Sequence, residues 1–184
     1  MTRDQALALL DEHIKNQNLI RHNLVVGFIM KALAKKFGQN EDDWELAGTL
    51  HDLDWEKTKD DFKSHTKVSR EILQKTDLKP EIVKAIYVHN WAHNIKPETL
   101  LEKTLYCVEE LSGLITAAAL IQPDKKLASV TTDSVMRKFR QKSFAAGVNR
   151  EIILLCKEYI DMELPELVEI SLNAMKERAE EIGL

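Results

Sequence analysis

The chain has 184 residues, of which 44% are hydrophobic and 30% charged, and this is enough for one compact domain with a substantial core. Its 6 glycines and 4 prolines supply little of the turn chemistry that an all-β fold needs, so we predict an all-α fold, a single-domain helical bundle. The net charge of −4 argues against a partner that is a nucleic-acid polymer or an anionic membrane, because such binders normally carry a basic surplus.

The cysteines and the apolar segments point to the cytoplasm. Cys107 and Cys156 lie in apolar helical contexts without CxxC spacing, so we expect them to be core residues rather than a redox pair or a zinc site. The first ten residues lack the pattern of a signal peptide. The longest apolar run, residues 111–121, is shorter than the roughly 20 residues that a membrane span needs. We therefore expect a cytoplasmic protein without a membrane partner, and a homo-oligomer stays open.

Helical periodicity runs through most of the chain. We predict helices at residues 4–15, 19–37, 41–53 and 64–75, then from Pro80, from Pro97 to 121, and at 131–142, 149–159 and 165–182. Gly38 suits a helix end because glycine tolerates a positive φ, and Ser64 suits an N-cap. Each proline suits a first helical turn, where its missing N–H is not needed. Residues 54–63 are highly charged and are predicted to form a loop.

Several histidines continue the apolar faces of their predicted helices. His22 stands in register with Val26 and Ile29, which places its imidazole on the buried side. The same test places three further histidines on buried faces, namely His51, His65 and His89. His13 also continues an apolar face, but we interpret it as structural because no matching carboxylate follows it. His93 is a secondary candidate if the helix of His89 extends that far.

Two carboxylates face the same way as these histidines. Asp52 directly follows His51, and Glu109 shares a helix face with Leu105, whereas Glu110 is predicted to turn away toward Lys103. A single inward histidine is usually a core residue satisfied by one hydrogen bond. Several of them beside two buried anions are better explained by a cation, because burying a carboxylate without a compensating charge is costly. The pattern therefore predicts a divalent metal site.

The order of these residues resembles the HD-domain superfamily of metal-dependent phosphohydrolases, and in particular its small stand-alone predicted hydrolases. The matching motifs are a histidine after a basic residue at 21–22, the sequence HDLD at 51–54, and a carboxylate-x-Leu-Ser-Gly segment at 109–113. The resemblance implies an HD metal-binding core at residues 19–121. Residues 122–184 would then form a C-terminal helical extension that packs on this core.

The resemblance also implies roles for individual residues. His22, His51 and Asp52 would bind the primary metal, and Glu109 occupies the position of the family's closing aspartate. In binuclear members the next two helices supply histidines for a second metal, and the matching residues here are His65 and His89. A mixed site of this kind suits Mn, Fe, Co, Ni, Zn or Mg ions. We expect one divalent ion, with a place for a second.

The implied reaction is attack on phosphorus by hydroxide, because a divalent metal lowers the pKa of a bound water. Asp52 would be central to it, and Asp54 and Glu56 are the nearest acids that could protonate a leaving group. Cations that could grip the substrate phosphate follow the doublet and recur on a later helix: Lys57, Arg137, Lys138 and Arg140. Ordinary solvated surface charge is the competing interpretation for these acids and cations. Trp55 and Trp91 could stack a base or pack at the rim.

We therefore predict a metal-dependent phosphohydrolase, either a phosphatase or a phosphodiesterase, whose partner is a small phosphorylated substrate such as a nucleotide. The main alternative is a degenerate HD-domain regulatory module that binds metal or nucleotide without turnover. Glu109 keeps this alternative open, since it departs from the family's aspartate. A third class is an oxygenase with a di-iron site, which would need iron in both metal positions.

Overall fold

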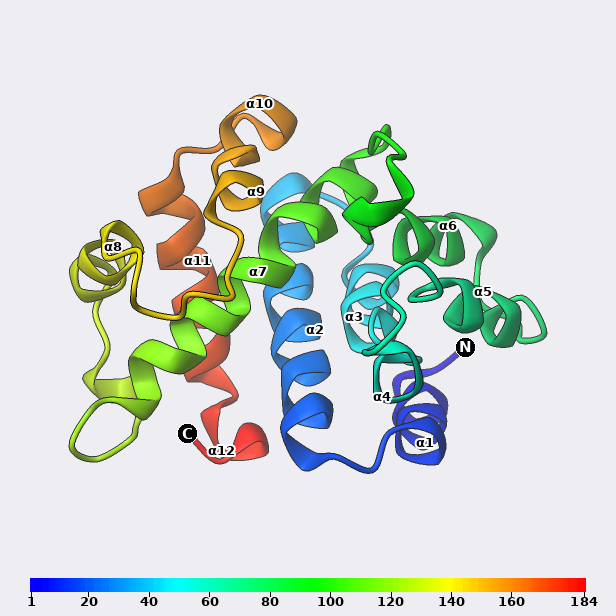
Figure 1. Cartoon of the computed structure of the whole chain (residues 1–184), viewed down its shortest axis with the longest axis horizontal. Helices are drawn as coiled ribbons and strands as arrows, with labels where there is room; N and C mark the ends of the chain where they lie inside the picture. Colours follow the sequence, from blue (N-terminus) through cyan, green and yellow to red (C-terminus); the bar gives the residue numbers. More distant parts are fainter.

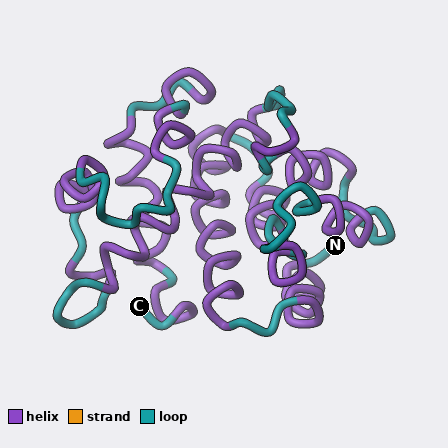
Figure 2. The backbone as a smooth tube through the Cα atoms, in the orientation of Figure 1, coloured by secondary structure: helices purple, strands orange, loops and turns teal.

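The computed structural model describes all 184 residues and contains helices but no strands, as predicted (Figures 1 and 2). The α-helices are α1 (Arg3–His13), α2 (Gln17–Phe37), α3 (Glu41–Leu50), α4 (Trp55–Thr58), α5 (Lys67–Leu73), α6 (Pro80–Val88), α7 (Leu100–Leu120), α8 (Thr132–Arg140), α9 (Arg150–Leu154), α10 (Cys156–Ile160), α11 (Leu164–Glu177) and α12 (Ala179–Ile182). Two short 3₁₀ helices complete the set, η1 (Trp91–His93) and η2 (Leu127–Ser129).

The long helices α2 and α7 cross at the centre of the molecule, with α3–α6 on one side and α8–α11 on the other (Figure 1). Helix α2 packs against α3, α7 and α11, so it belongs to both halves. One apolar core runs through these contacts, and it includes the fully buried residues Leu33, Leu50, Leu111 and Val168. The two halves therefore share a core instead of forming separate domains.

Helices α2 and α3 approach each other closely at a pair of glycines. A Cβ atom added to Gly48 would lie 2.6 Å from the backbone nitrogen of Gly27, so a side chain cannot be accommodated there. Only glycine permits backbones to approach this closely. The crossing point lies three residues before His51 and five after His22, and it therefore brings these two histidines to the same level of the bundle.

Away from the glycines, one buried carboxylate connects several helices. Glu45 of α3 is 3% exposed and accepts hydrogen bonds from Arg3 at 2.9 Å, Lys31 at 2.7 Å and Arg178 at 2.8 Å. These cations come from α1, from α2 and from the junction between α11 and α12. Because three cations neutralise it, the buried carboxylate ties four parts of the chain together.

Two predicted helix starts are wrong. Ser64 does not cap a helix, because its hydroxyl donates to the carboxylate of Asp61 at 2.5 Å, and α5 begins three residues later, after Thr66 with its positive φ of 67°. Pro97 precedes α7 without belonging to it. Thr99 is the N-cap and accepts a hydrogen bond from the backbone of Glu102 at 3.2 Å.

Other predicted segments are divided. The predicted loop 54–63 contains the short α4, the predicted helix 149–159 is divided into α9 and α10, and the predicted helix 165–182 into α11 and α12. Helix α6 ends at Val88, and the side chain of Asn90 caps η1 by accepting from the backbone of Ala92 at 3.0 Å. His93 therefore lies outside the helix that precedes His89.

Candidate metal centre

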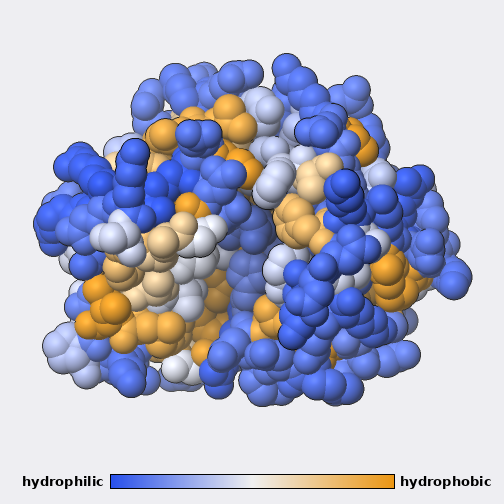
Figure 3. Space-filling model, in the orientation of Figure 1, coloured by the Kyte–Doolittle hydropathy of each residue, from blue (hydrophilic) through white to orange (hydrophobic).

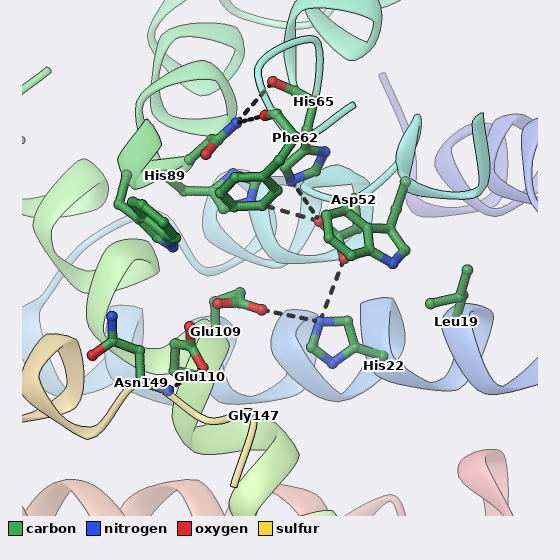
Figure 4. A pocket seen from close by; sticks show the side chains of 13 residues that line it. Leu19, His22, Asp52, Phe62, His65, His89, Glu109, Glu110, Gly147 and Asn149 are labelled. Carbon is green, nitrogen blue, oxygen red and sulfur yellow. Dashed lines mark hydrogen bonds and ion pairs between the residues drawn. The ribbon is translucent and has the colours of Figure 1, made fainter. Parts of the chain in front are cut away.

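The structure brings all six predicted ligands to one place, and Figure 4 shows all of them except His51. They come from α2, from the end of α3, from the turn before α5, from the end of α6 and from α7, in the order His22, His51 with Asp52, His65, His89 and Glu109. Their ligand atoms form two groups that share Asp52, one with His22 and His51 and one with His65 and His89. Each group places its ligand atoms within 4.8 Å of one another.

The first group is built around two facing imidazoles. His22 Nε2 lies 3.2 Å from His51 Nε2, 3.7 Å from Asp52 Oδ2 and 3.6 Å from Glu109 Oε1. Burial lowers the pKa of His51 to about 4, so its imidazole is neutral at pH 7. Burial alone would also lower the pKa of His22, but the Glu109 and Asp52 carboxylates outweigh it and raise that pKa.

The tautomers of these two imidazoles follow from their neighbours. His51 Nδ1 lies 2.8 Å from the carbonyl oxygen of Gly48, so Nδ1 carries the hydrogen. His22 Nδ1 lies 3.2 Å from Ser112 Oγ, whose own hydrogen is donated to the carbonyl of Glu109 at 2.7 Å. Ser112 therefore accepts from His22 Nδ1. With a hydrogen on Nδ1 of each ring, the two Nε2 atoms face each other, and a cation between them and the carboxylates could replace the proton that the raised pKa of His22 favours.

The second group shares Asp52 with the first. Asp52 Oδ1 lies 3.2 Å from His65 Nε2 and 3.6 Å from His89 Nε2, while its backbone N–H donates to Asn23 Oδ1 at 3.2 Å. His89 Nδ1 donates to the carbonyl of Ile86 at 2.7 Å, so its Nε2 also faces the cluster as an acceptor. Asp52 Oδ1 thus lies near His51, His65 and His89, and Oδ2 lies near His22, so this one carboxylate could contribute to metal binding in both groups.

His65 is oriented by Asp54. The His65 Nδ1 atom lies 2.8 Å from Asp54 Oδ1, and Asp54 Oδ2 accepts the backbone N–H of Ser69 at 2.9 Å. Burial opposes protonation of His65, but the Asp52 and Asp54 carboxylates dominate and raise its pKa to about 9. Electrostatic attraction to His51, followed by hydrogen bonds from His65 and His89, keeps the pKa of Asp52 well below its usual range despite burial.

The placement of Asp54 corrects its predicted role as a proton donor. Its side chain is 1% exposed and does not line the cavity, because it lies behind His65 and is fully engaged there. Glu56, the other predicted acid, accepts the backbone N–H of Lys15 at 2.6 Å and also stays outside the cavity. Neither carboxylate lines the cavity that the predicted metal ligands face.

The predicted phosphate-binding cations are also placed elsewhere. Lys57 points to His13, with Nζ 3.2 Å from Nδ1, and none of the three α8 cations lines the cavity. These three are Arg137, Lys138 and Arg140. Helix α8 packs on α7 and α11, on the side of the molecule opposite α3–α6 (Figure 1). Surface charge, the competing interpretation, describes this helix better than substrate binding does.

His93 is likewise not placed as a ligand. Its Nε2 atom lies 2.9 Å from Thr66 Oγ1 and 3.0 Å from the carbonyl of His65, so the ring supports the backbone next to the cluster. Asn90 has a similar function, because its amide donates to the carbonyls of Phe62 at 2.9 Å and His65 at 3.1 Å. Both side chains hold the turn that presents His65.

Sequence reasoning missed one carboxylate and one loop. Glu110 lines the cavity together with Glu109, and its carboxylate accepts the backbone N–H of Asn149 at 2.8 Å (Figure 4). Burial, reinforced by Glu109, raises the pKa of Glu110 to about 7. Gly147 and Asn149 also line the cavity, although they lie far along the chain from the other ligands. No local pattern marks this loop, since its position depends on tertiary packing.

The cluster opens into a cavity of about 480 Å³ whose wall contains no lysine or arginine. Three aromatic side chains form part of the wall, namely Trp55, Phe62 and Trp91. The ring of Phe62 lies 5.0 Å from that of Trp91 and 5.8 Å from that of Trp55, measured between centroids. A ligand in this cavity therefore meets carboxylates and imidazoles at its base and aromatic surfaces at its side.

The HD-domain family profile matches residues 19–121, more than half of the chain, so the protein belongs to the HD-domain family. At the level of this family the protein is a hydrolase, and its histidine and aspartate groups could hold the divalent metals that HD domains bind. No solved structure was found to match the chain. None of the helices combines the length and the apolar character needed to cross a lipid bilayer.

Curated relatives of the chain carry the name ribonuclease Y. The protein from Geotalea uraniireducens is 33% identical over 152 residues, which cover 80% of this chain and 29% of the relative. The protein from Geobacter sulfurreducens is 28% identical over 152 residues, with the same coverage of 80% and 29%. The one from Campylobacter jejuni is 26% identical over 183 residues, or 88% of this chain and 35% of the relative. The chain thus spans about a third of the length of these relatives.

Proposed function

We propose that this protein is a metal-dependent phosphohydrolase that acts on a small phosphorylated molecule, with nucleotides as the preferred class. The observation that carries the proposal is the convergence of four imidazole Nε2 atoms on the two oxygens of Asp52. Anchored Nδ1 atoms and a neutral His51 are the features expected of metal ligands. The family match supports the same reaction class.

In this proposal, the histidines and carboxylates of the cluster bind the metal ions, and the metal ions bind the substrate phosphate. One divalent ion would be held by His22, His51, Asp52 and Glu109. A second ion would be held by Asp52 together with His65 and His89. Such ions activate water and neutralise the charge of a phosphoryl group. Since no lysine or arginine lines the cavity, that neutralisation must come from the metal centre. Any further negative charge on the substrate would find no lysine or arginine within this cavity.

The aromatic wall supports a nucleotide as substrate. Trp91 is 48% exposed although it lies against Phe62, and exposing half of an indole leaves a large apolar surface in water. A planar base could cover this surface by stacking, an interaction worth about 1–3 kcal/mol per base. A cavity of about 480 Å³ has room for one nucleotide, which is consistent with a small substrate.

Cleavage of RNA is the second candidate, because the curated relatives are named ribonuclease Y. It requires the same metal centre and the same attack on phosphorus, and it differs in the size of the substrate. The regulatory module without turnover is the third. The first two candidates predict different reaction products, and the third predicts metal binding without any product. One set of assays on the same purified protein therefore separates them.

The test measures metal content first and hydrolysis second. The purified protein is loaded with Mn²⁺, Fe²⁺, Co²⁺, Ni²⁺, Zn²⁺ or Mg²⁺ and assayed with phosphomonoesters, nucleotides, phosphodiesters and single-stranded RNA. We expect hydrolysis of nucleotides that is lost in both His51→Ala and Asp52→Ala. His13→Ala is the matched control, since it removes a histidine that pairs only with Lys57.

The outcomes separate the candidates. Turnover of RNA without turnover of nucleotides would reject the small-molecule proposal in favour of the second candidate. Tight metal binding without turnover of any phosphate ester would support the regulatory module. Activity that survives in Asp52→Ala would contradict the assignment of the reaction to this cluster.

A further inference from the structure

A second cavity lies next to the metal centre, between α2, α7 and α12. It has a volume of about 430 Å³, and His22 lines both cavities. Its walls include Val25 of α2 and Ala117 and Leu120 of α7, which form an apolar surface. In Figure 3 this face of the molecule is hollowed along its middle, and hydrophobic residues gather beside the lower part of the hollow.

Two cations line this cavity without an acidic partner. Arg21 contacts only the amide oxygen of Asn18, at 3.4 Å, and Lys125 has no side-chain hydrogen bond and no ion pair. Arg3 and Arg178, by contrast, both bind Glu45 and Glu181. Two unpaired cations beside an apolar wall form a surface that complements an anion attached to an apolar group.

Helices fix the position of Arg21 and of the near wall of the second cavity relative to the metal ligands, and Lys125 lies in the loop that follows α7. Arg21 directly precedes His22 on α2, and Gly113, which lines the second cavity, follows Glu109 by one turn of α7. One helical turn is about 5.4 Å along the axis. A ligand bound at the metal centre therefore needs to extend by about one turn of helix to reach the second cavity.

Building on the proposed function, we propose that the second cavity is an anion subsite that holds a further phosphate of the substrate. The phosphate at the metal centre would be the one hydrolysed, and Arg21 and Lys125 would bind the neighbouring one. Of the two cavities that His22 lines, only the second contains lysine or arginine side chains that could bind a second phosphate. Val25 and Leu120 would pack against the nucleoside that carries it. The substrate class is then a nucleotide compound with a phosphate beyond the scissile one.

The test compares two substrates that differ by one phosphate. Thymidylyl-thymidine contains a single phosphodiester, and its 3′-phosphorylated and 5′-phosphorylated forms add a terminal phosphate on either side. With Mn²⁺-loaded protein we expect one phosphorylated form to have a KM about tenfold lower than the unphosphorylated dinucleotide, the effect of a charge-assisted contact. The double variant Arg21→Ala/Lys125→Ala should lose this preference.

The matched control is Arg137→Ala/Lys126→Ala, which removes the same charges from exposed positions that line neither cavity. It should keep the preference. A native protein without preference for either terminal phosphate would overturn the subsite, as would a double variant that retains the preference.

A second readout separates this proposal from the proposed function. Dissociation constants for the same dinucleotides, measured by calorimetry with Mn²⁺ present, do not depend on turnover. A preference in Kd that disappears in the double variant supports the subsite even if no phosphate ester is hydrolysed, which would reject only the proposed reaction. Equal Kd values for all forms would reject the subsite, whatever the enzyme hydrolyses.

Discussion

At the scale of single residues, Asp54 acts through His65. Its carboxylate binds His65 Nδ1 at 2.8 Å and the Ser69 N–H at 2.9 Å, so an amide in its place would set an NH₂ group against one of these donors. We expect Asp54→Asn to weaken binding of a second Mn²⁺ by about 10- to 100-fold, the usual effect of losing an outer partner of a metal ligand. Calorimetric titration with Mn²⁺ measures this affinity.

The exposed Asp61, which binds only Ser64 and the nearby backbone, supplies the control Asp61→Asn. Unchanged binding of both ions in Asp54→Asn would contradict the positioning role of this carboxylate.

The longer side chain of Glu109 matches its distance from the cluster. Glu109 Oε1 lies 3.6 Å from His22 Nε2, and a carboxylate shorter by one methylene would be withdrawn from it. We therefore expect Glu109→Asp to lower affinity for the first ion, roughly tenfold, instead of restoring a better site. Metal affinity and kcat measured together decide this point. A large gain in activity would mean that the native glutamate compromises the site.

At the scale of elements, the crossing of α2 and α3 depends on Gly48. A methyl group there would meet Gly27 N at 2.6 Å and its Cα at 2.7 Å, and neither backbone can yield without moving a helix that carries metal ligands. We expect Gly48→Ala to lower the free energy of unfolding by about 3 kcal/mol and Tm by roughly 10 °C. Gly113→Ala is the control, because its nearest neighbour lies 3.9 Å away, at Val148. Equal Tm values for the two variants would contradict the tight crossing.

The Glu45 cluster makes stability depend on pH. Burial favours the neutral acid, but hydrogen bonds from Lys31 and Arg178 outweigh it and lower the pKa of Glu45 below its ordinary value of 4.5. A lowered pKa in the folded state adds stability that is complete above the unfolded value and is lost as pH falls through the folded one. Glu45→Gln should therefore lower the free energy of unfolding by about 3 kcal/mol at pH 7, and by much less below about pH 4.

Thermal unfolding of the native protein and of Glu45→Gln, measured from about pH 3 to about pH 8, checks this prediction. Substitution of an exposed residue, Glu158→Gln, is the control. A difference in Tm that stays constant over this range would show that the carboxylate charge is not the source of the stabilisation.

At the scale of the whole molecule, the C-terminal part completes the cavity. The Arg150 guanidinium donates to backbone carbonyls throughout residues 139–148, at distances from 2.5 to 3.4 Å. This network holds the loop that places Gly147 and Asn149 on the cavity wall. We expect Arg150→Ala to raise KM about tenfold while leaving metal affinity intact, because the loop contributes no ligand.

Steady-state kinetics and metal titration check this expectation, with Arg137→Ala of α8 as the control. A rise in KM for Arg137→Ala, and none for Arg150→Ala, would restore the substrate-binding role first predicted for α8.

The helical fold and the inward direction of the histidines could be predicted from the sequence, because both depend on local periodicity. A side chain every three or four residues on one helix face is a property of the chain itself. His22, His51 and Glu109 are therefore assigned to the interior without knowledge of their neighbours. Helix starts were less predictable, as at Ser64, whose hydroxyl binds a nearby carboxylate instead of a backbone N–H.

Only the tertiary structure decided which groups meet. Asp54 follows the doublet by two residues, yet its carboxylate turns behind His65, whereas Glu110, predicted to face away, lines the cavity because Asn149 binds it from a distant loop. Such pairings depend on how helices cross, and the backbone contact of Gly27 with Gly48 sets one crossing that no periodicity encodes. The sequence by itself thus determined the helices and the metal-binding residue types, while long-range packing determined the shape and charge of the cavity around them.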